Sequence, residues 1–160
     1  MADELVAAYT RDRAPHPLVD GALETMEKLS GYTFYVVTDK TRKELEAAAE
    51  ESCFPLERIT GIITSDIVGR KKPSPEVLRY ALEAVSEDTN FIKGSEIHYV
   101  FDSLDEIEMI RRARTMGIET VKPLITWQTG PNAREEFLNA NVNREQLIGT
   151  VARLPNALGL

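Results

Sequence analysis

The sequence predicts an α/β fold: a doubly wound, Rossmann-like and mostly parallel sheet with helices on both faces. Short continuous apolar runs alternate along the chain with segments whose apolar residues recur at helical spacing. Strands buried on both faces need such uninterrupted runs, and the helices between them return the chain to begin each new parallel strand. With 160 residues and 42% apolar content, a single domain over residues 17–160 is expected.

The first predicted elements are a helix, a buried strand and a second helix. Asp20 is placed to cap the first helix. The inward face of that helix is expected to consist of Leu23, Met26 and Leu29. The continuous apolar run Phe34–Val37 predicts the strand. Thr41 and Glu44 have the spacing of a capping box, which predicts the start of the second helix.

Two further strands are predicted at Ile62–Ile63 and Ile97–Phe101, with a helix between them. Ser74 as N-cap, followed by Pro75 at the first helical position, predicts where this helix begins. Its inward residues are expected to be Val77, Leu78, Ala81, Leu82 and Val85. Gly117 is a natural left-handed cap for the helix that follows Phe101.

The two ends of the chain complete the prediction. Residues 1–16 contain a short helical stretch and are expected to form a lead-in helix. The run Ile118–Thr126 predicts a last strand, and Pro123 makes it an edge candidate because proline has no N–H to donate. Helices are predicted to begin at Asn132 and Asn143, each of which has Glu or Gln three residues later.

Charge and cysteine content limit the classes of partner. The net charge of -7 argues against nucleic acid and anionic membrane, which both need clustered Lys and Arg. No apolar run approaches a membrane span, and the first residues lack the basic start of a signal peptide. Cys53 is the single cysteine, so we expect a reduced cytoplasmic setting and a buried Cys53. A small diffusible ligand or a protein partner is favoured.

Three short motifs at strand ends resemble those of haloacid dehalogenase-like hydrolases, in the same order. They are Tyr35-Val36-Val37-Thr38, Lys72-Pro73-Ser74-Pro75 and Tyr99-Val100-Phe101-Asp102. The segment from Met116 through Trp127 to Leu138 resembles the C-terminal half of that family, so the resemblance covers roughly residues 17–154. It implies hydrolysis of a small phosphate monoester with Mg²⁺, and a cap helix as a second reading of residues 1–16.

The first two motifs supply candidate phosphate-binding residues. By resemblance, the hydroxyl of Thr38 holds a phosphoryl oxygen; the competing interpretation is a turn or cap residue at a strand end. By the same resemblance Lys72 is the catalytic and phosphate-binding lysine, because a compact ammonium suits several anionic oxygens in a low-dielectric site. The alternative for Lys72 is a solvated basic run before a helix, and Lys71 is the fallback one position earlier.

The third motif supplies candidate metal ligands. The resemblance gives Asp102 and Glu106 as Mg²⁺ ligands, and hard carboxylate oxygens suit this ion. Two departures stand out, since Phe101 replaces the usual glycine and Glu106 replaces the usual aspartate. The competing interpretation of Glu106 is a capping box with Ser103.

The nucleophile motif of the family, Asp-x-Asp at the end of a first strand, does not occur in the sequence. The resemblance implies that this strand lies between those ending at Thr38 and Asp102, so the core is expected to lack its first strand and to leave two unpaired edges. An internal start, a second chain, a second copy or direct pairing of the two strands would each resolve this. The chain is therefore either an incomplete phosphohydrolase or a catalytically inactive binding module. Another Rossmann-like binding module is the third reading, but no glycine-rich nucleotide loop occurs.

Overall fold

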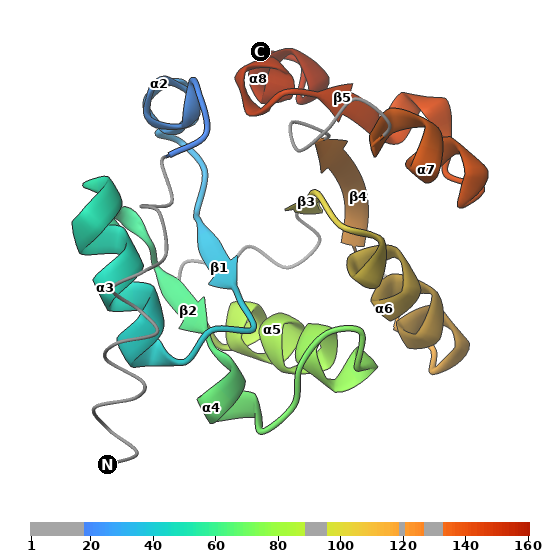
Figure 1. The fold of residues 1–160 in the computed structure, drawn as a ribbon, viewed down its shortest axis with the longest axis horizontal. Coiled ribbons are helices and arrows are strands. Elements are labelled where there is room, and N and C mark those ends of the chain that lie inside the picture. The colour runs from blue at the N-terminus through green and yellow to red at the C-terminus, as the bar shows by residue number, and fades with distance from the viewer. Residues whose placement is uncertain (1–17, 89–95, 119–120, 127–132) are drawn as a thin grey trace.

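Two parallel sheets with surrounding helices form the fold in the computed structural model, which describes residues 18–88, 96–118, 121–126 and 133–160 (Figure 1). In chain order the elements are α2 (Ala22–Lys28), β1 (Tyr35–Val37), α3 (Arg42–Ser52), η1 (Leu56–Arg58), β2 (Gly61–Ile63), α4 (Ser65–Val68), α5 (Pro75–Glu87), β3 (Ile97–Phe101), α6 (Leu104–Thr115), β4 (Val121–Thr126), α7 (Ala133–Asn139), η2 (Arg144–Gln146), β5 (Leu147–Gly149), η3 (Val151–Arg153) and α8 (Leu154–Ala157). The predicted α/β class is confirmed. The predicted helix within residues 1–16 lies outside the described residues, and among the described helices none is long and apolar enough to cross a membrane.

The strands fall into two separate sheets. β1 pairs in parallel with β2, whereas β3, β4 and β5 form a second parallel sheet with β4 in the middle. No strand of the described residues joins β1 to β3, and Figure 1 shows the β1–β2 sheet set apart from the sheet of β3, β4 and β5. Direct pairing of the strands that end before Thr38 and Asp102 is therefore not the solution adopted by the described chain.

The edge position predicted for the strand containing Pro123 is wrong. β4 lies between β3 and β5, and Pro123 is in register with Tyr99 of β3. Proline is tolerated there because β5 pairs with β4 only at Ile125 and Thr126. At Pro123, no described strand therefore lies on the side of β4 that faces away from β3, so no N–H is needed there.

The helix predicted to begin at Asn143 is also wrong. The Asn143 side chain does cap, accepting a hydrogen bond from the Glu145 N–H, but only the three-residue turn η2 follows. The chain then enters β5, in which Ile148 is buried. In a strand of three residues, the alternation of apolar and polar side chains is too short to be told from one turn of a helix. The capping pattern at Asn143 therefore decided the prediction.

Three local predictions fail near turns, while two caps are confirmed. Gly21, not Asp20, is the N-cap of α2 and adopts a left-handed φ of 79°. Leu23 of that helix is 38% exposed, although it was expected to face inward. Cys53 is exposed, because it ends α3 in a left-handed conformation and does not point into the core. The Thr41 capping box and the Ser74 N-cap are observed as predicted.

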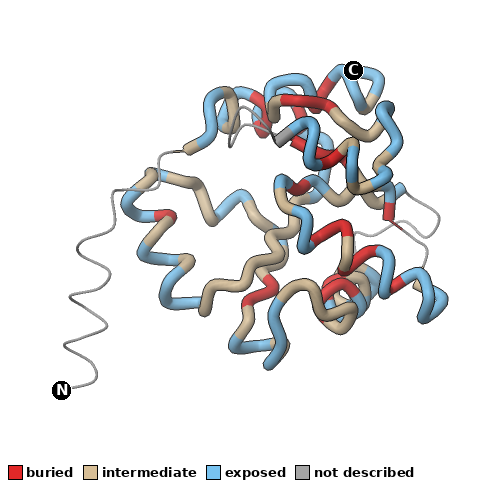
Figure 2. The backbone as a smooth tube through the Cα atoms, turned by 45° about the vertical axis from the view of Figure 1, so that its right-hand side comes forward, coloured by how far each residue is buried: buried red, intermediate tan, exposed pale blue. Residues whose placement is uncertain are grey.

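The buried core is divided between two clusters and is unevenly distributed. The larger cluster is centred on α5, α6, β3 and β4, and it includes Leu78, Phe101 and Met109. The smaller consists of Leu29, Leu124, Ile148 and Leu154, with Phe34 packed against it. Between residues 30 and 60 only Ala49 is buried, and Figure 2 shows long unburied stretches on the side away from the C-terminus. The β1–β2 half therefore has little core of its own.

The β1–β2 pair is fixed by an aromatic side chain lying over a glycine. Tyr35 is in register with Gly61, and a Cβ added at Gly61 would overlap the Tyr35 ring. The Tyr35 hydroxyl donates to Asp88 Oδ2 at 2.7 Å, just beyond α5. Burial, followed by the bond to Asp88 and its negative charge, raises the pKa of Tyr35 to about 12.

Gly61→Ala should destabilise the domain by about 1–3 kcal/mol, because the new methyl group displaces the Tyr35 ring and breaks its bond to Asp88. Urea denaturation measures the change. Gly31→Ala is the matched control, since nothing lies within 4 Å of a Cβ there, and it should change stability by less than about 0.5 kcal/mol. In a Tyr35→Ala background the Gly61→Ala cost should largely disappear. Equal costs in both backgrounds would contradict this packing.

His98 gives the fold a pH dependence. It is a partly buried residue of β3, and its Nδ1 is buried without a partner in the described chain. Burial lowers the pKa of His98 below its ordinary value of 6.5, and the nearby Glu96 carboxylate opposes this only in part. The unfolded chain therefore binds a proton more readily than the folded chain.

The free energy of unfolding should accordingly be independent of His98 above pH 6.5 and fall as the pH decreases from 6.5 through the lower pKa of the folded state. Chemical denaturation between pH 8 and pH 5 measures the slope. The His98→Gln variant should lose most of this slope while keeping any decline below about pH 4.5, where carboxylates titrate. An unchanged slope in the variant would exclude His98 as its source.

Candidate active site

Lys72 joins the carboxyl ends of β1 and β3. Its backbone N–H donates to Asp39 Oδ1 at 2.9 Å, and Asp39 lies two residues beyond the end of β1. Its ammonium Nζ lies 2.5 Å from Glu106 Oε1, in the first turn of the helix that follows β3. The side chains of Lys72 and Glu106 are 14% and 7% exposed, so this ion pair is largely buried.

Both carboxylate oxygens of Glu106 are engaged. Oε1 accepts from Lys72, and Oε2 accepts from the Ser103 hydroxyl. Ser103 is the N-cap residue of α6, but its side chain makes no capping bond to the helix backbone. The pair expected from a capping box therefore meets side chain to side chain, and the predicted metal ligand Glu106 is held by a cation and a hydroxyl.

Thr38 lies at the end of β1, next to Asp39. Its N–H donates to the Ile63 carbonyl at 2.9 Å, which extends the pairing with β2. Its Oγ1 accepts from the Lys40 N–H at 3.2 Å. These contacts match the turn role considered for Thr38, and they leave its hydroxyl hydrogen available to an acceptor.

Asp102 follows β3 directly and is exposed. Its neighbour Phe101 is buried in the larger core cluster, where its ring centroid lies 5.7 Å from that of Tyr99. The Phe101 carbonyl accepts from the Thr126 hydroxyl at 3.4 Å. Phe101 therefore anchors the strand end from which Asp102 projects. In the described ranges no group of three His, Cys, Asp or Glu side chains is arranged to hold a metal ion.

Asp39 and Tyr99 were not identified from the sequence. Burial raises the pKa of Tyr99 well above its ordinary value, and the negative charges of Glu106 and then Asp39 add to this effect. The neutral phenol of Tyr99 therefore lies within electrostatic reach of both carboxylates that contact Lys72. Asp39 stands directly after the predicted Thr38, so its position beside a motif was an available signal. Nothing in the local pattern around Tyr99 separated it from an ordinary strand residue.

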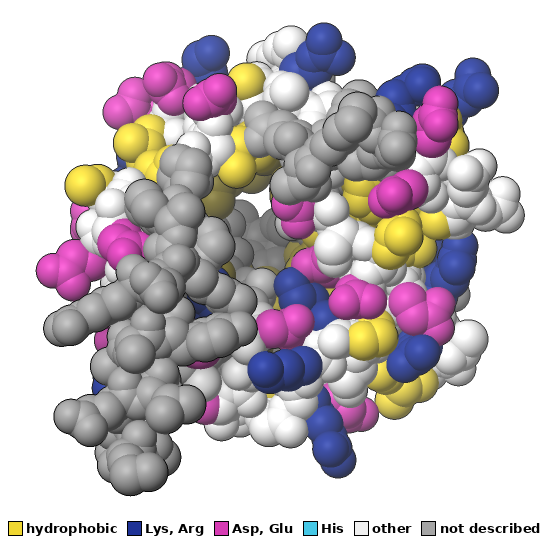
Figure 3. Space-filling model, in the orientation of Figure 1, with side chains coloured by type: hydrophobic (Ala, Val, Ile, Leu, Met, Phe, Trp, Pro, Cys, Tyr) yellow, Lys and Arg dark blue, Asp and Glu magenta, His cyan; other side chains and the backbone are white. Residues whose placement is uncertain are grey.

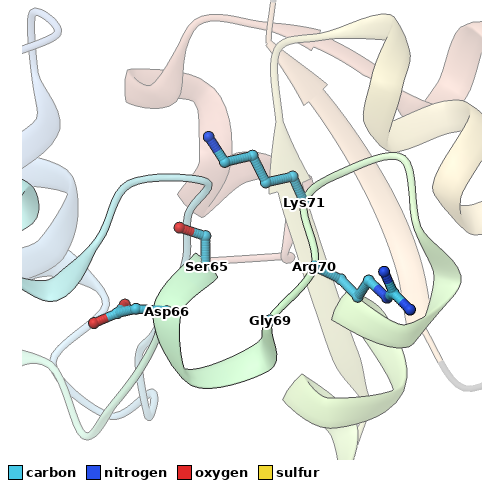
Figure 4. Close-up of a pocket in the computed structure, with 5 residues that line it drawn as sticks. All are labelled: Ser65, Asp66, Gly69, Arg70 and Lys71. Carbon is cyan, nitrogen blue, oxygen red and sulfur yellow. The ribbon is translucent and has the colours of Figure 1, made fainter.

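The residues that immediately precede Lys72 in the sequence line an open pocket of about 360 Å³. It is lined by Ser65, Asp66, Gly69, Arg70 and Lys71. Figure 4 shows the Arg70 and Lys71 side chains pointing in different directions from this loop. Lys71 is exposed, whereas Lys72 is the lysine that contacts Asp39 and Glu106. Of the two lysines considered for the motif, Lys72 and Lys71, the contacts favour Lys72.

Comparison with known proteins identifies the family. A family model described as haloacid dehalogenase-like hydrolase matches residues 2–114. The chain belongs to the haloacid dehalogenase-like hydrolases. A HAD-superfamily hydrolase from Ehrlichia chaffeensis has 22% sequence identity and a TM-score of 0.54, over 82% of this chain and 63% of its own. The HAD-hydrolase YfnB from Bacillus subtilis, solved bound to magnesium, has 21% identity and a TM-score of 0.48, over 69% and 44%.

These comparisons bear on the fold and on the extent of the chain. The likeness to the Ehrlichia hydrolase supports the haloacid dehalogenase-like α/β fold. The chain spans less than two thirds of the length of either solved hydrolase. A search among curated proteins found no match.

Lys72→Met should destabilise this haloacid dehalogenase-like domain by about 3–5 kcal/mol, because it leaves the Glu106 carboxylate buried without its cation. Urea denaturation at pH 7 measures the loss. Lys71→Met is the matched control, since that exposed neighbour should cost less than about 0.5 kcal/mol. The double variant Lys72→Met with Glu106→Gln should recover part of the lost stability. Similar costs for Lys71→Met and Lys72→Met would refute the buried pair.

Proposed function

We propose that this chain is part of a phosphohydrolase that acts on a small phosphate monoester with Mg²⁺. The observation that carries the proposal is the position of Lys72, which contacts residues beyond the carboxyl ends of both β1 and β3. In parallel α/β folds, ligands bind outside the carboxyl ends of the strands. Membership of a hydrolase family supports the same class of reaction.

The phosphate would be held by Lys72 and Thr38. An ammonium group has three donors, and Glu106 occupies one of them. The remaining two can reach phosphoryl oxygens, and the pairing with Glu106 fixes where the positive charge lies. Thr38 adds a hydroxyl hydrogen from the neighbouring strand end. Charge development on a phosphoryl group is stabilised best by donors that are already oriented in this way.

Asp102 is the residue that fits Mg²⁺ best. The ion is commonly held by one or two protein carboxylates together with substrate phosphate and water, and Asp102 supplies one exposed carboxylate at a strand end. Glu106 fits less well as a direct ligand while both of its oxygens are engaged, so we assign it to holding Lys72. When bound, Mg²⁺ would shield the negative charge between phosphate and carboxylates.

The nucleophilic carboxylate would come from outside this sequence. No Asp-x-Asp motif occurs in the 160 residues. In the family, covalent phosphoryl transfer depends on the first aspartate of that motif as the nucleophile. The same absence favours the second candidate, a catalytically inactive module that binds phosphate, metal or a partner. Both candidates keep the cytoplasmic setting expected from the sequence, and neither involves nucleic acid or membrane.

With p-nitrophenyl phosphate and Mg²⁺, the isolated chain should turn over substrate at the background rate, because oriented charges without a nucleophile provide binding alone. Release of nitrophenolate measures this. Robust Mg²⁺-dependent turnover that Asp102→Asn abolishes would overturn the external nucleophile.

Mg²⁺ binding tests the metal site that the proposal places at Asp102. Isothermal titration in the presence of inorganic phosphate should show Mg²⁺ affinity that Asp102→Asn weakens by at least about tenfold. Asp105→Asn is the matched control, because Asp105 is an exposed carboxylate in the first turn of α6, and it should leave the affinity within about twofold of the parent. Equal losses in the two variants, or no binding in the parent chain, would remove the support for a Mg²⁺-dependent site.

A further inference from the structure

The loops that follow β1 and β2 are bonded to each other. The Ser65 N–H donates to the Lys40 carbonyl at 3.1 Å, and the Arg42 N–H donates to Asp66 Oδ1 at 3.2 Å. Ser65 and Asp66 also line the open pocket drawn in Figure 4. The pocket therefore lies at the carboxyl ends of these two strands, as the proposed phosphate site does.

The polar side chains of this pocket differ in direction. Figure 4 shows the Ser65 hydroxyl and the Lys71 ammonium extending toward the same side of the loop between α4 and α5. The Arg70 guanidinium extends the other way, and the Asp66 carboxylate points away from Lys71. One hydroxyl and one cation therefore face a common region, while the neighbouring negative charge is directed elsewhere.

Lys71 and Lys40 are cations without a fixed partner. The pKa of Glu44 is lowered first by its hydrogen bonds to Thr41 and then by the charges of Lys40 and Lys71, so both ammonium groups lie near that carboxylate. Glu44 is bonded to the N–H and the hydroxyl of Thr41. Neither lysine makes an ion pair with another described residue. Their positive charge is therefore available to a ligand.

We propose that this pocket binds a second anionic group of the substrate, a carboxylate or a further phosphate, through Lys71 and the Ser65 hydroxyl. The inference rests on the proposed function, in which Lys72 holds the phosphoryl group. The two lysines serve different places, since Lys72 is the one that contacts Asp39 and Glu106. Because adjacent Cα atoms are about 3.8 Å apart, one small molecule can span both lysines. The substrate class then narrows to phosphate monoesters with a second negative charge.

The charge of the whole protein makes this preference informative. A chain with a net charge of -7 repels a ligand with two anionic groups more strongly than a ligand with one. In Figure 3, Lys and Arg side chains lie among Asp and Glu around α5, without a broad basic patch there. A gain in affinity from the second anionic group therefore has to come from local contacts. An exposed ammonium with a hydroxyl contributes modestly, so a gain of about fourfold is expected.

The test measures the affinities of three probes for the full 160-residue chain by NMR titration. Mg²⁺ is left out, because phosphate groups on the probes would bind it. Propane-1,3-diol bisphosphate and 3-phosphoglycerate carry a second anionic group, whereas n-propyl phosphate does not. At least one of the first two should bind about fourfold more tightly than propyl phosphate and shift the amide signals of Ser65 and Lys71. The probe with the larger gain identifies the second group as phosphate or carboxylate.

Two variants locate the source of the gain. Lys71→Met should reduce it to less than about twofold. Arg70→Met is the matched control, because it removes a neighbouring exposed cation whose side chain points away from Ser65. This control should keep the gain.

Equal affinities for all three probes would overturn the second anionic site and leave the proposed phosphohydrolase function standing. Equal loss of the gain in Lys71→Met and Arg70→Met would also overturn it, because the attraction would then be diffuse. Probes with two anionic groups that shift Ser65 and Lys71 but not Thr38 or Lys72 would support the pocket and remove the proposed phosphate site. The inference and the proposed function can therefore fail separately.

Discussion

The contacts of Lys72 are the constraint on which the arrangement of this domain depends. The two sheets share no strand pairing in the described chain, and Lys72 is bonded to Asp39 of one half and Glu106 of the other. Around this link, α5 packs against α6 and against both strands of the smaller sheet. A buried ion pair adds little net stability, because desolvation of both charges offsets their attraction. Its value here is geometric, since it fixes where the carboxyl ends of β1 and β3 lie relative to each other.

This link also shows how one lysine could serve both the fold and the proposed phosphate site. Removing it would leave Glu106 uncompensated, so loss of the cation has a structural penalty in addition to any effect on the proposed phosphate site. The neutral Tyr99 phenol, whose pKa is raised by burial and by the nearby carboxylates, adds no negative charge to this cluster. The charge near the strand ends is therefore set by Lys72, Glu106, Asp39 and Asp102 together with any bound ligand.

The strands and helix starts that local chemistry specifies could be predicted from the sequence. The Thr41 capping box, the Ser74 N-cap and the strand Ile97–Phe101 depend on residues close together in the chain, and all three are observed. The predictions at Asp20 and Pro123 failed because their outcome depends on distant residues. Ala152 lies close to Gly21, and β5 stops short of Pro123.

The candidate site shows the same difference between features that nearby residues determine and features that distant residues determine. Thr38, Lys72 and Asp102 were selected because their three motifs resemble those of the family in the same order, and the fold brings Lys72 into contact with Asp39, the neighbour of Thr38. The pairing of Lys72 with Glu106 could not be predicted, because the two residues are 34 positions apart and the sequence offered Ser103 as the nearer partner. Ser103 does contact Glu106, but through the second oxygen. The Glu106 side chain thus takes part both in the pair with Ser103 that the capping pattern suggested and in the long-range ion pair with Lys72.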